Sequence, residues 1–177
     1  MKVGKVYLHL IMKLEDAKEE FIQAWGALGS SWGINRTMSS IHALLMANGT
    51  PLSTEDIMAA LQVSRGNANM NTRALIDWGL VKKHRIAGDR KEYFVAGKDV
   101  WEMASQIAKE RRKRELSPII ESLKNLRDIE ENSEEAENFK KRINDLHDFT
   151  SEISGLVDKF TRNDRNWFYR SLLKLIG

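Results

Sequence analysis

Side chains that can recognise the edges of DNA bases are concentrated between positions 64 and 73. They are Ser64, at a predicted helix N-cap, followed on one side of that helix by Arg65, Gly66, Asn67, Asn69, Met70 and Arg73. An Asn amide can bond N6 and N7 of adenine together, an Arg can bond O6 and N7 of guanine, and a Gly near the helix start lets the backbone approach a phosphate. Because Asn costs up to about 0.7 kcal/mol relative to Ala in a helix, three of them in one short helix favour a recognition role. The alternative is a solvated polar face on a loosely defined helix.

The other side of this helix is predicted to face a hydrophobic core. Its residues are spaced four, three and three apart, with Asn71 on the boundary: Ala68, Thr72, Leu75 and Trp78. Gly79 is placed to end the helix. A shorter amphipathic helix is predicted before it, from the N-cap Ser53, with Asp56 three residues on, to Gln62. Two short helices with so tight a joint are typical of a helix-turn-helix, whose second helix can lie in a DNA major groove about 12 Å wide.

A basic β-hairpin is predicted directly after these helices. Its strands are expected at Leu80 to Arg85 and Lys91 to Val95, around the turn residues Ala87-Gly88-Asp89. Five cations surround the acid Asp89: Lys82, Lys83, Arg85, Arg90 and Lys91. Such a hairpin, or wing, suits the phosphate backbone or the minor groove. The alternative is a charged edge that prevents strand aggregation.

Three stretches resemble the winged-helix regulators of the MarR superfamily, and the likeness is closer to the GbsR-type branch. They are Pro51-Leu52-Ser53, Gly79-Leu80-Val81, and Gly88 to Phe94 followed by Lys98-Asp99-Val100-Trp101. The resemblance covers about residues 14 to 130. It implies that Asp89 orients a following basic residue toward the minor groove. Many members carry an Arg where this chain has Lys91, so either Arg90 or Lys91 is expected to enter the groove.

Composition limits the class of protein. The chain has 177 residues, 42% of them hydrophobic, only two prolines and a net charge of +3, so any nucleic-acid affinity must come from localised charge. With no cysteine, disulfides and thiolate zinc sites are excluded. The longest apolar run is far below the roughly 20 residues of a membrane span, and no cleavable signal is visible. We therefore expect a cytoplasmic protein with no membrane partner.

A first helix is predicted from about Glu15 to Trp32. Its apolar stripe, at spacings of four, three and four, is Phe21, Trp25, Leu28 and Trp32. Gly26 and Gly29 lie on or beside this stripe and predict that another helix packs very closely there. In the resembled family the first helix belongs to the dimer interface, and GbsR-type relatives include sensors of choline-like cations. Such a cation is held by aromatic faces, and the candidates here are Trp25, Trp32, Tyr93 and Trp101, although tryptophans at helical spacing are more often core residues.

Further helices are predicted on both sides of the wing. Asn35 is expected to cap a helix that ends at Asn48-Gly49, and Thr50-Pro51-Leu52 is expected to pair with the wing. After the wing, a long helix contains the basic run Lys109 to Arg114, which either touches phosphate or is a solvated face. Ser117-Pro118 is either an N-cap with proline at the first helical position or a kink.

The last third of the chain carries an apolar seam at spacings of four and three. Its members are Phe139, Ile143, Leu146, Thr150, Ile153, Val157 and Phe160. A short amphipathic helix with Trp167 and Leu175 follows. The seam must be buried, either by the chain's own helices or, as the resemblance implies, by interlocking with a second subunit.

These patterns predict a mostly α fold: a winged helix-turn-helix with a small β-hairpin wing, plus N- and C-terminal dimerisation helices. The expected parts are an extension at 1–11, the N-terminal interface helix at 12–33, the DNA-binding domain at 34–97 and a helical linker and dimerisation region at 98–177. The predicted function is a homodimeric, sequence-specific transcription regulator, a repressor, on a pseudo-palindromic operator in double-stranded DNA. A small-molecule effector is compatible with this prediction.

Two other functions compete with DNA-binding regulation. One is a winged helix that binds a partner protein without specific DNA binding, although its binding face should be more apolar and aromatic than the Asn and Arg face described above. The other is an enzyme, and it is disfavoured because no phosphate loop, nucleophile motif or metal set is visible, and no cofactor is implied. The four histidines, His9, His42, His84 and His147, are interpreted as structural or solvent-facing.

Overall fold

The computed structural model describes residues 12–31, 33–131 and 133–162, and the chain divides into two compact units after Lys98. The predicted extension at 1–11, Trp32 and the short helix predicted around Trp167 to Leu175 lie outside the described residues. Within the described ranges no helix is both long enough and apolar enough to cross a membrane.

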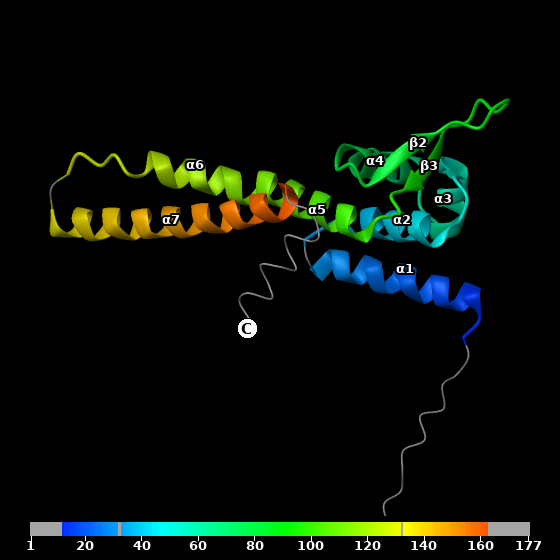
Figure 1. The fold of residues 1–177 in the computed structure, drawn as a ribbon, viewed down its shortest axis with the longest axis horizontal. Helices are drawn as coiled ribbons and strands as arrows, with labels where there is room; N and C mark the ends of the chain where they lie inside the picture. The colour runs from blue at the N-terminus through cyan, green and yellow to red at the C-terminus, as the bar shows by residue number, and fades with distance from the viewer. Residues whose placement is uncertain (1–11, 32, 132, 163–177) are drawn as a thin grey trace, which may run out of the picture. The chain divides into compact units, whose positions relative to one another are not determined.

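The first unit is a winged helix-turn-helix, as predicted (Figure 1). Its elements are α1 (Leu14–Ser31), α2 (Arg36–Ala47), β1 (Leu52–Ser53), α3 (Thr54–Leu61), α4 (Arg65–Asp77), β2 (Val81–His84) and β3 (Tyr93–Ala96). The strands form one antiparallel sheet in the order β1-β3-β2. Leu52 pairs with Phe94, which confirms that the extended piece before α3 pairs with the wing.

The core of this unit lies between α2, α4 and the sheet. Ile41, Ile57, Leu75 and Val81 are each 1% exposed or less. The predicted apolar side of α4 is buried along its whole length, and Gly79, with a φ of +73°, ends the helix in the left-handed conformation expected of it. Because one side of α4 supplies the core, its other side is left on the surface.

The close approach predicted for the two glycines of α1 is confirmed, and the neighbouring helix is α2. Both glycines are buried, and a Cβ added at Gly26 would lie 2.5 Å from Ser40 Oγ, while one at Gly29 would lie 2.6 Å from Ser39 Cβ. Asn35 caps α2 as expected by accepting a hydrogen bond from the Met38 N–H. The glycine side of α1 therefore faces α2, and other side chains of α1 remain on the surface.

The wing differs from its prediction because its strands are shorter. The ladder ends at the pair His84 and Tyr93, and residues 85–92 form a loop that projects from the sheet (Figure 1). Within the loop the Asp89 N–H bonds the Ile86 carbonyl, and Gly88 has a φ of +84°. The loop residues are exposed and mostly charged, so there is no apolar face whose burial would extend the strands.

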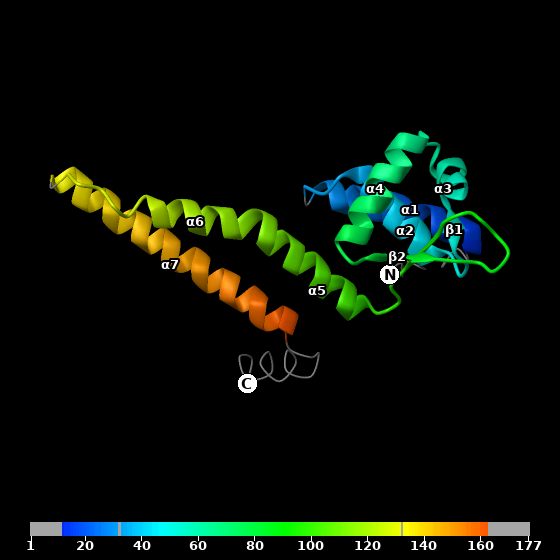
Figure 2. The same ribbon diagram turned by 90° about the horizontal axis from the view of Figure 1, so that it is seen from above.

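The second unit is an antiparallel helical hairpin, visible in Figure 2 as two rods side by side. One rod is α5 (Val100–Arg111), a π-helical turn η1 (Arg112–Leu116) and α6 (Ser117–Asn125); the other is α7 (Glu134–Arg162). Ser117 does not cap a new helix, since its backbone N–H and its hydroxyl both bond the carbonyl of Arg112. The rod widens locally before Pro118, which has no N–H to contribute to a regular helical turn.

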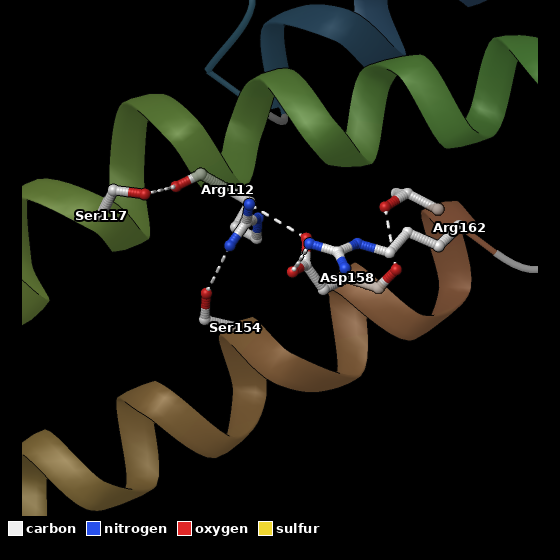
Figure 3. A network of polar contacts seen from close by, with 6 residues as sticks. Arg112, Ser117, Ser154, Asp158 and Arg162 are labelled. Atoms are coloured by element: carbon white, nitrogen blue, oxygen red, sulfur yellow. Dashed lines mark hydrogen bonds and ion pairs between the residues drawn. The ribbon is translucent and has the colours of Figure 1, made fainter.

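Within the basic run at 109–114, Arg112 links the two rods of this hairpin. Figure 3 shows Arg112 reaching across to α7, where it donates to Ser154 Oγ at 3.1 Å and pairs with Asp158 at 2.9 Å. Arg111 pairs with Glu115 along the same helix. These ion pairs give Arg111 and Arg112 a structural role that neither expectation for the run, phosphate contact or a solvated face, included.

The apolar seam predicted on α7 is divided between two faces of the helix. Of its predicted members only Ile143 is buried, because α5 and α6 cover a face that also holds Ala136 and Ser154. A second row, at spacings of seven, three, four and three, is exposed by 37 to 63%: Phe139, Leu146, Phe149, Ile153 and Leu156. We call these five residues the α7 row.

Candidate nucleic-acid interface

The two helices of the helix-turn-helix, α3 and α4, each begin at a residue that is fixed by local hydrogen bonds. Ser53 and Asp56 form the complete capping box, with the Ser53 N–H donating to Asp56 Oδ2 at 2.8 Å and the Asp56 N–H donating to Ser53 Oγ at 3.2 Å. Gln62 ends α3 in the left-handed conformation, and Ser64 caps α4 by accepting from the Asn67 N–H. The predicted caps are thus confirmed: the capping box fixes the start of α3, and the Ser64 cap fixes the start of α4 after the turn.

The structure places the predicted base-reading residues on one surface of α4. Ser64, Arg65, Gly66, Met70 and Arg73 are exposed, with Met70 at 61%, and Asn67 and Asn69 are half-buried. This polar surface lies opposite the buried residues of the same helix. We call these seven residues the reading face.

Two residues of α3 that no sequence pattern identifies as functional support the reading face. Glu55 pairs with Arg65 at 2.9 Å, and Thr54 Oγ1 donates to Asn69 Oδ1 at 3.3 Å. A backbone hydrogen bond, and after it the hydrogen bond from Arg65, hold the pKa of Glu55 below its usual range. The first turn of α3 thus orients side chains that lie ten and fifteen positions along the chain, a contact that no local pattern predicts.

Asn71 does not lie on the boundary of the reading face, as the helical spacing predicted, but is buried at 3% exposure. Its Nδ2 donates to the Asn67 carbonyl at 2.8 Å and to Asn67 Oδ1 at 2.6 Å. Because these bonds satisfy both N–H groups of its amide inside the fold, Asn71 belongs to the core side of α4.

The wing loop is organised by Asp89. Its carboxylate accepts from the Lys91 N–H at 2.9 Å and from the Tyr93 hydroxyl at 2.7 Å. The Lys91 N–H, followed by the Tyr93 hydroxyl, lowers the pKa of Asp89, and the same hydroxyl bond raises the pKa of Tyr93. Asp89 is therefore ionised at neutral pH and fixes the main chain beside Arg90 and Lys91, whereas the resemblance implies that it orients a basic side chain.

The wing also contains a second acid that its predicted charge count left out. Glu92 pairs with Lys83 at 2.7 Å, so one of the five cations is compensated within the hairpin. Arg85, Arg90 and Lys91 remain exposed around the loop. These three are the wing cations best placed to meet an external anion.

The described candidates for an aromatic ligand cage have separate structural neighbours. Trp25 lies 5.7 Å from Phe21 and 6.4 Å from His42, measured between ring centroids, whereas Tyr93 is bonded to Asp89. Trp101, in the second unit, lies 4.9 Å from Phe160. Each ring thus has a packing or hydrogen-bonding role of its own, and the cage stays a prediction.

Comparison with known proteins agrees with a regulator fold. No protein family model matches the chain. The chain is similar to the HTH-type transcriptional regulator MmpR5 of Mycobacterium tuberculosis, with 32% identity over 76 residues that cover 42% of this chain and 46% of the relative, so it spans about half of that relative's length. It is also similar to a crystal structure of a transcriptional regulator, with a TM-score of 0.63 and 21% identity over 82% of this chain and 97% of the other. At 21% identity, the similarity to this crystal structure concerns the fold alone.

Proposed function

We propose that this protein is a sequence-specific DNA-binding transcription regulator that inserts α4 into the major groove. The observation that carries the proposal is the reading face, which gathers two Arg and two Asn side chains opposite a buried face of the same helix. These side chain types form the common bidentate contacts to guanine and adenine. The similarity to a named HTH-type transcriptional regulator supports the same function.

In this proposal the wing adds affinity and little sequence information. Arg85, Arg90 and Lys91 are exposed around a loop that projects from the sheet. Cations at such a loop suit phosphate oxygens or the negative potential of a narrow minor groove. Asp89 supports them by fixing the main chain at Lys91.

We further propose that the protein is a homodimer held partly by the α7 row. An exposed apolar row at coiled-coil spacing requires a partner surface, and a second copy of α7 offers a matching one. Phe21 and Leu28 of α1, exposed by 37 and 39%, offer a second apolar surface. A two-fold dimer would read two half-sites of a pseudo-palindrome about 34 to 36 Å apart.

The proposed mode of action is repression, and the proposed location is the cytoplasm. A dimer seated across an operator excludes other proteins from the same stretch of DNA, which favours repression. Membership of the MarR superfamily, its GbsR-type branch and control by a small-molecule effector remain part of the proposal. They rest on the resemblance of the wing and linker sequences.

Selection of bound sites from random duplex DNA, repeated over a salt series, tests the DNA-binding proposal. Asn69→Ala and Arg73→Ala should each weaken binding to the selected site by about 1 to 3 kcal/mol, with little change on random DNA. Asn144→Ala on α7, an exposed Asn in the other unit, is the matched control and should change neither. An equal loss on both DNAs would contradict base reading, and failure to select any site would favour the protein-interaction alternative.

A charged substitution in the α7 row tests the dimer. Phe149 is 63% exposed within one chain, so Phe149→Asp should leave the folded chain intact while it opposes burial against a second copy. Light scattering should report a dimer for the unchanged chain and a monomer for the variant, together with weaker operator binding. A monomeric unchanged chain that binds its site tightly would refute this arrangement.

A further inference from the structure

The amide of Asn67 has a fixed orientation that follows from its contacts with Asn71. A backbone carbonyl can only accept a hydrogen bond, so the Asn71 atom 2.8 Å from the Asn67 carbonyl must be the donor Nδ2. The same Nδ2 lies 2.6 Å from the side chain of Asn67, and the atom it meets there must be an acceptor, Oδ1. The Oδ1 of Asn67 is therefore engaged inside the helix, and its Nδ2 is the group left to bond elsewhere.

This orientation is held by a residue that DNA cannot reach in the folded protein. Asn71 is only 3% exposed, and its two N–H groups are both used on Asn67. If Asn67 turned its Oδ1 outward, one N–H of Asn71 would be left buried without an acceptor. An unsatisfied buried donor is unfavourable, so this arrangement opposes rotation of the Asn67 amide.

We propose that Asn71 is a positioning residue that presents Asn67 to DNA as a hydrogen-bond donor, so that the base it reads is guanine rather than adenine. The inference rests on the proposed function and specifies what one position of the reading face recognises. Guanine offers two acceptors, N7 and O6, on its major-groove edge, whereas adenine offers the acceptor N7 beside the donor N6. The familiar pairing of Asn with adenine requires Oδ1 to accept from N6, and here that atom is already bonded to Asn71.

The neighbouring side chains of the reading face have the same polarity. Arg65 and Arg73 can only donate. Together with Nδ2 of Asn67 they present donors to the groove, which suits acceptor-rich base edges. Arg65 is in turn held by Glu55 at 2.9 Å, a second case in which a side chain beside the reading face orients a member of it.

Site selection with variants at two positions tests the inference. Asn67→Ala identifies the base position that Asn67 reads, because the preference there alone should be lost. In the unchanged chain that position should be guanine, favoured over adenine on the order of tenfold. Replacing this guanine with 7-deazaguanine, which lacks the N7 acceptor, should weaken binding of the unchanged chain about tenfold and leave Asn67→Ala unaffected.

Two substitutions separate positioning from a merely structural role. Asn71→Ser can still donate to the Asn67 carbonyl through its hydroxyl but cannot also hold Oδ1, so the preference for guanine over adenine should fall toward equality at this position alone. Asn67→Asp should accept from Asn71 on one side and present an acceptor to the groove, which changes the preferred base to cytosine through its N4 donor. Thermal unfolding of both variants should confirm that they remain folded. If Asn71→Ser unfolds, the base that the unchanged chain selects at the position read by Asn67 decides the matter, and adenine there would overturn the inference.

The outcomes distinguish this inference from the function on which it rests. If the unchanged chain selects no sequence, both the regulator function and the inference are wrong. If it selects a site with adenine at the position read by Asn67, the function stands and the inference fails. A preference for guanine that persists in folded Asn71→Ser would also overturn the role of Asn71.

Discussion

Replacement of His42 by Phe should make the stability of the first unit less sensitive to acid. His42 lies in α2 at 3% exposure, and burial lowers its pKa from 6.5 to about 4. Each pKa unit corresponds to about 1.36 kcal/mol, so charging His42 in the folded protein is about 3 kcal/mol less favourable than in the unfolded chain. Since the pKa of His42 is lower in the folded protein than in the unfolded chain, the contribution of neutral His42 to the free energy of unfolding is fully present above pH 6.5. It is lost as the pH falls toward 4.

Urea unfolding of the two proteins at several pH values between 7.5 and 4 measures this effect. Other groups also lose stabilising interactions in acid, because the pKa values of Glu55 and Asp56 lie below their usual range. Those losses are common to both proteins and cancel in the difference. Phe is a suitable replacement because it is apolar and close in size to His. Its ring would also lie beside Trp25, whose ring centroid is 6.4 Å from that of His42.

The unchanged protein should therefore lose about 3 kcal/mol more than His42→Phe over this pH range. The difference should develop mainly between pH 6.5 and 4, where the unfolded chain binds a proton and the folded protein does not. Parallel stability curves for the two proteins would refute the reasoning, since they would mean that His42 is charged in the folded state as easily as in water.

Two further predictions concern helix packing and the wing. Gly29→Ala should lower the free energy of unfolding by about 1 kcal/mol, because overpacking against Ser39 exceeds the gain in helix propensity. Chemical denaturation should show that Ser39→Gly lowers the free energy of unfolding less in the Gly29→Ala variant than in the unchanged chain. The control Gly66→Ala, at a position with open space around it, should not lower the free energy of unfolding. A Gly29→Ala variant more stable than the unchanged chain would contradict the close packing. Arg90→Ala or Lys91→Ala should reduce the magnitude of the log-log salt slope of DNA binding by about 0.9 for each phosphate contact removed. Unchanged slopes in both variants would mean that the wing does not touch DNA.

The local features of the fold could be predicted because they depend on contacts within about four residues. Asn35, Ser53 and Ser64 are capping residues whose partners are three positions away, and each cap is present in the structure. Gly29 predicted a close helix contact because a glycine within a helix is unfavourable unless something needs the space. The winged helix-turn-helix followed from these signals together with the spacing of apolar residues.

The seam of α7 was predicted as a single stripe, and only packing showed that it is two. Helical spacing identifies which residues share a side of a helix. How many of them are buried depends on how the neighbouring helices pack against that side. In this chain α5 and α6 cover Ile143 and leave Leu146 and Phe149 exposed. The wing likewise ended earlier than its composition indicated, because strand pairing stops where there is no longer an apolar face to bury.

By itself, the sequence determined that this chain carries a helix with an Asn and Arg surface, because residue type and helical period are enough to place side chains on one side. Tertiary structure alone decided how those side chains are oriented. Glu55 meets Arg65 only because α3 and α4 pack across a tight turn, and Asn71 is buried rather than marginal only because other elements of the first unit pack against α4. Whether an Asn side chain presents its N–H groups or its oxygen to a ligand depends on a rotation of the amide that no sequence pattern predicts. In Asn67 the hydrogen bond from the buried Asn71 sets this rotation.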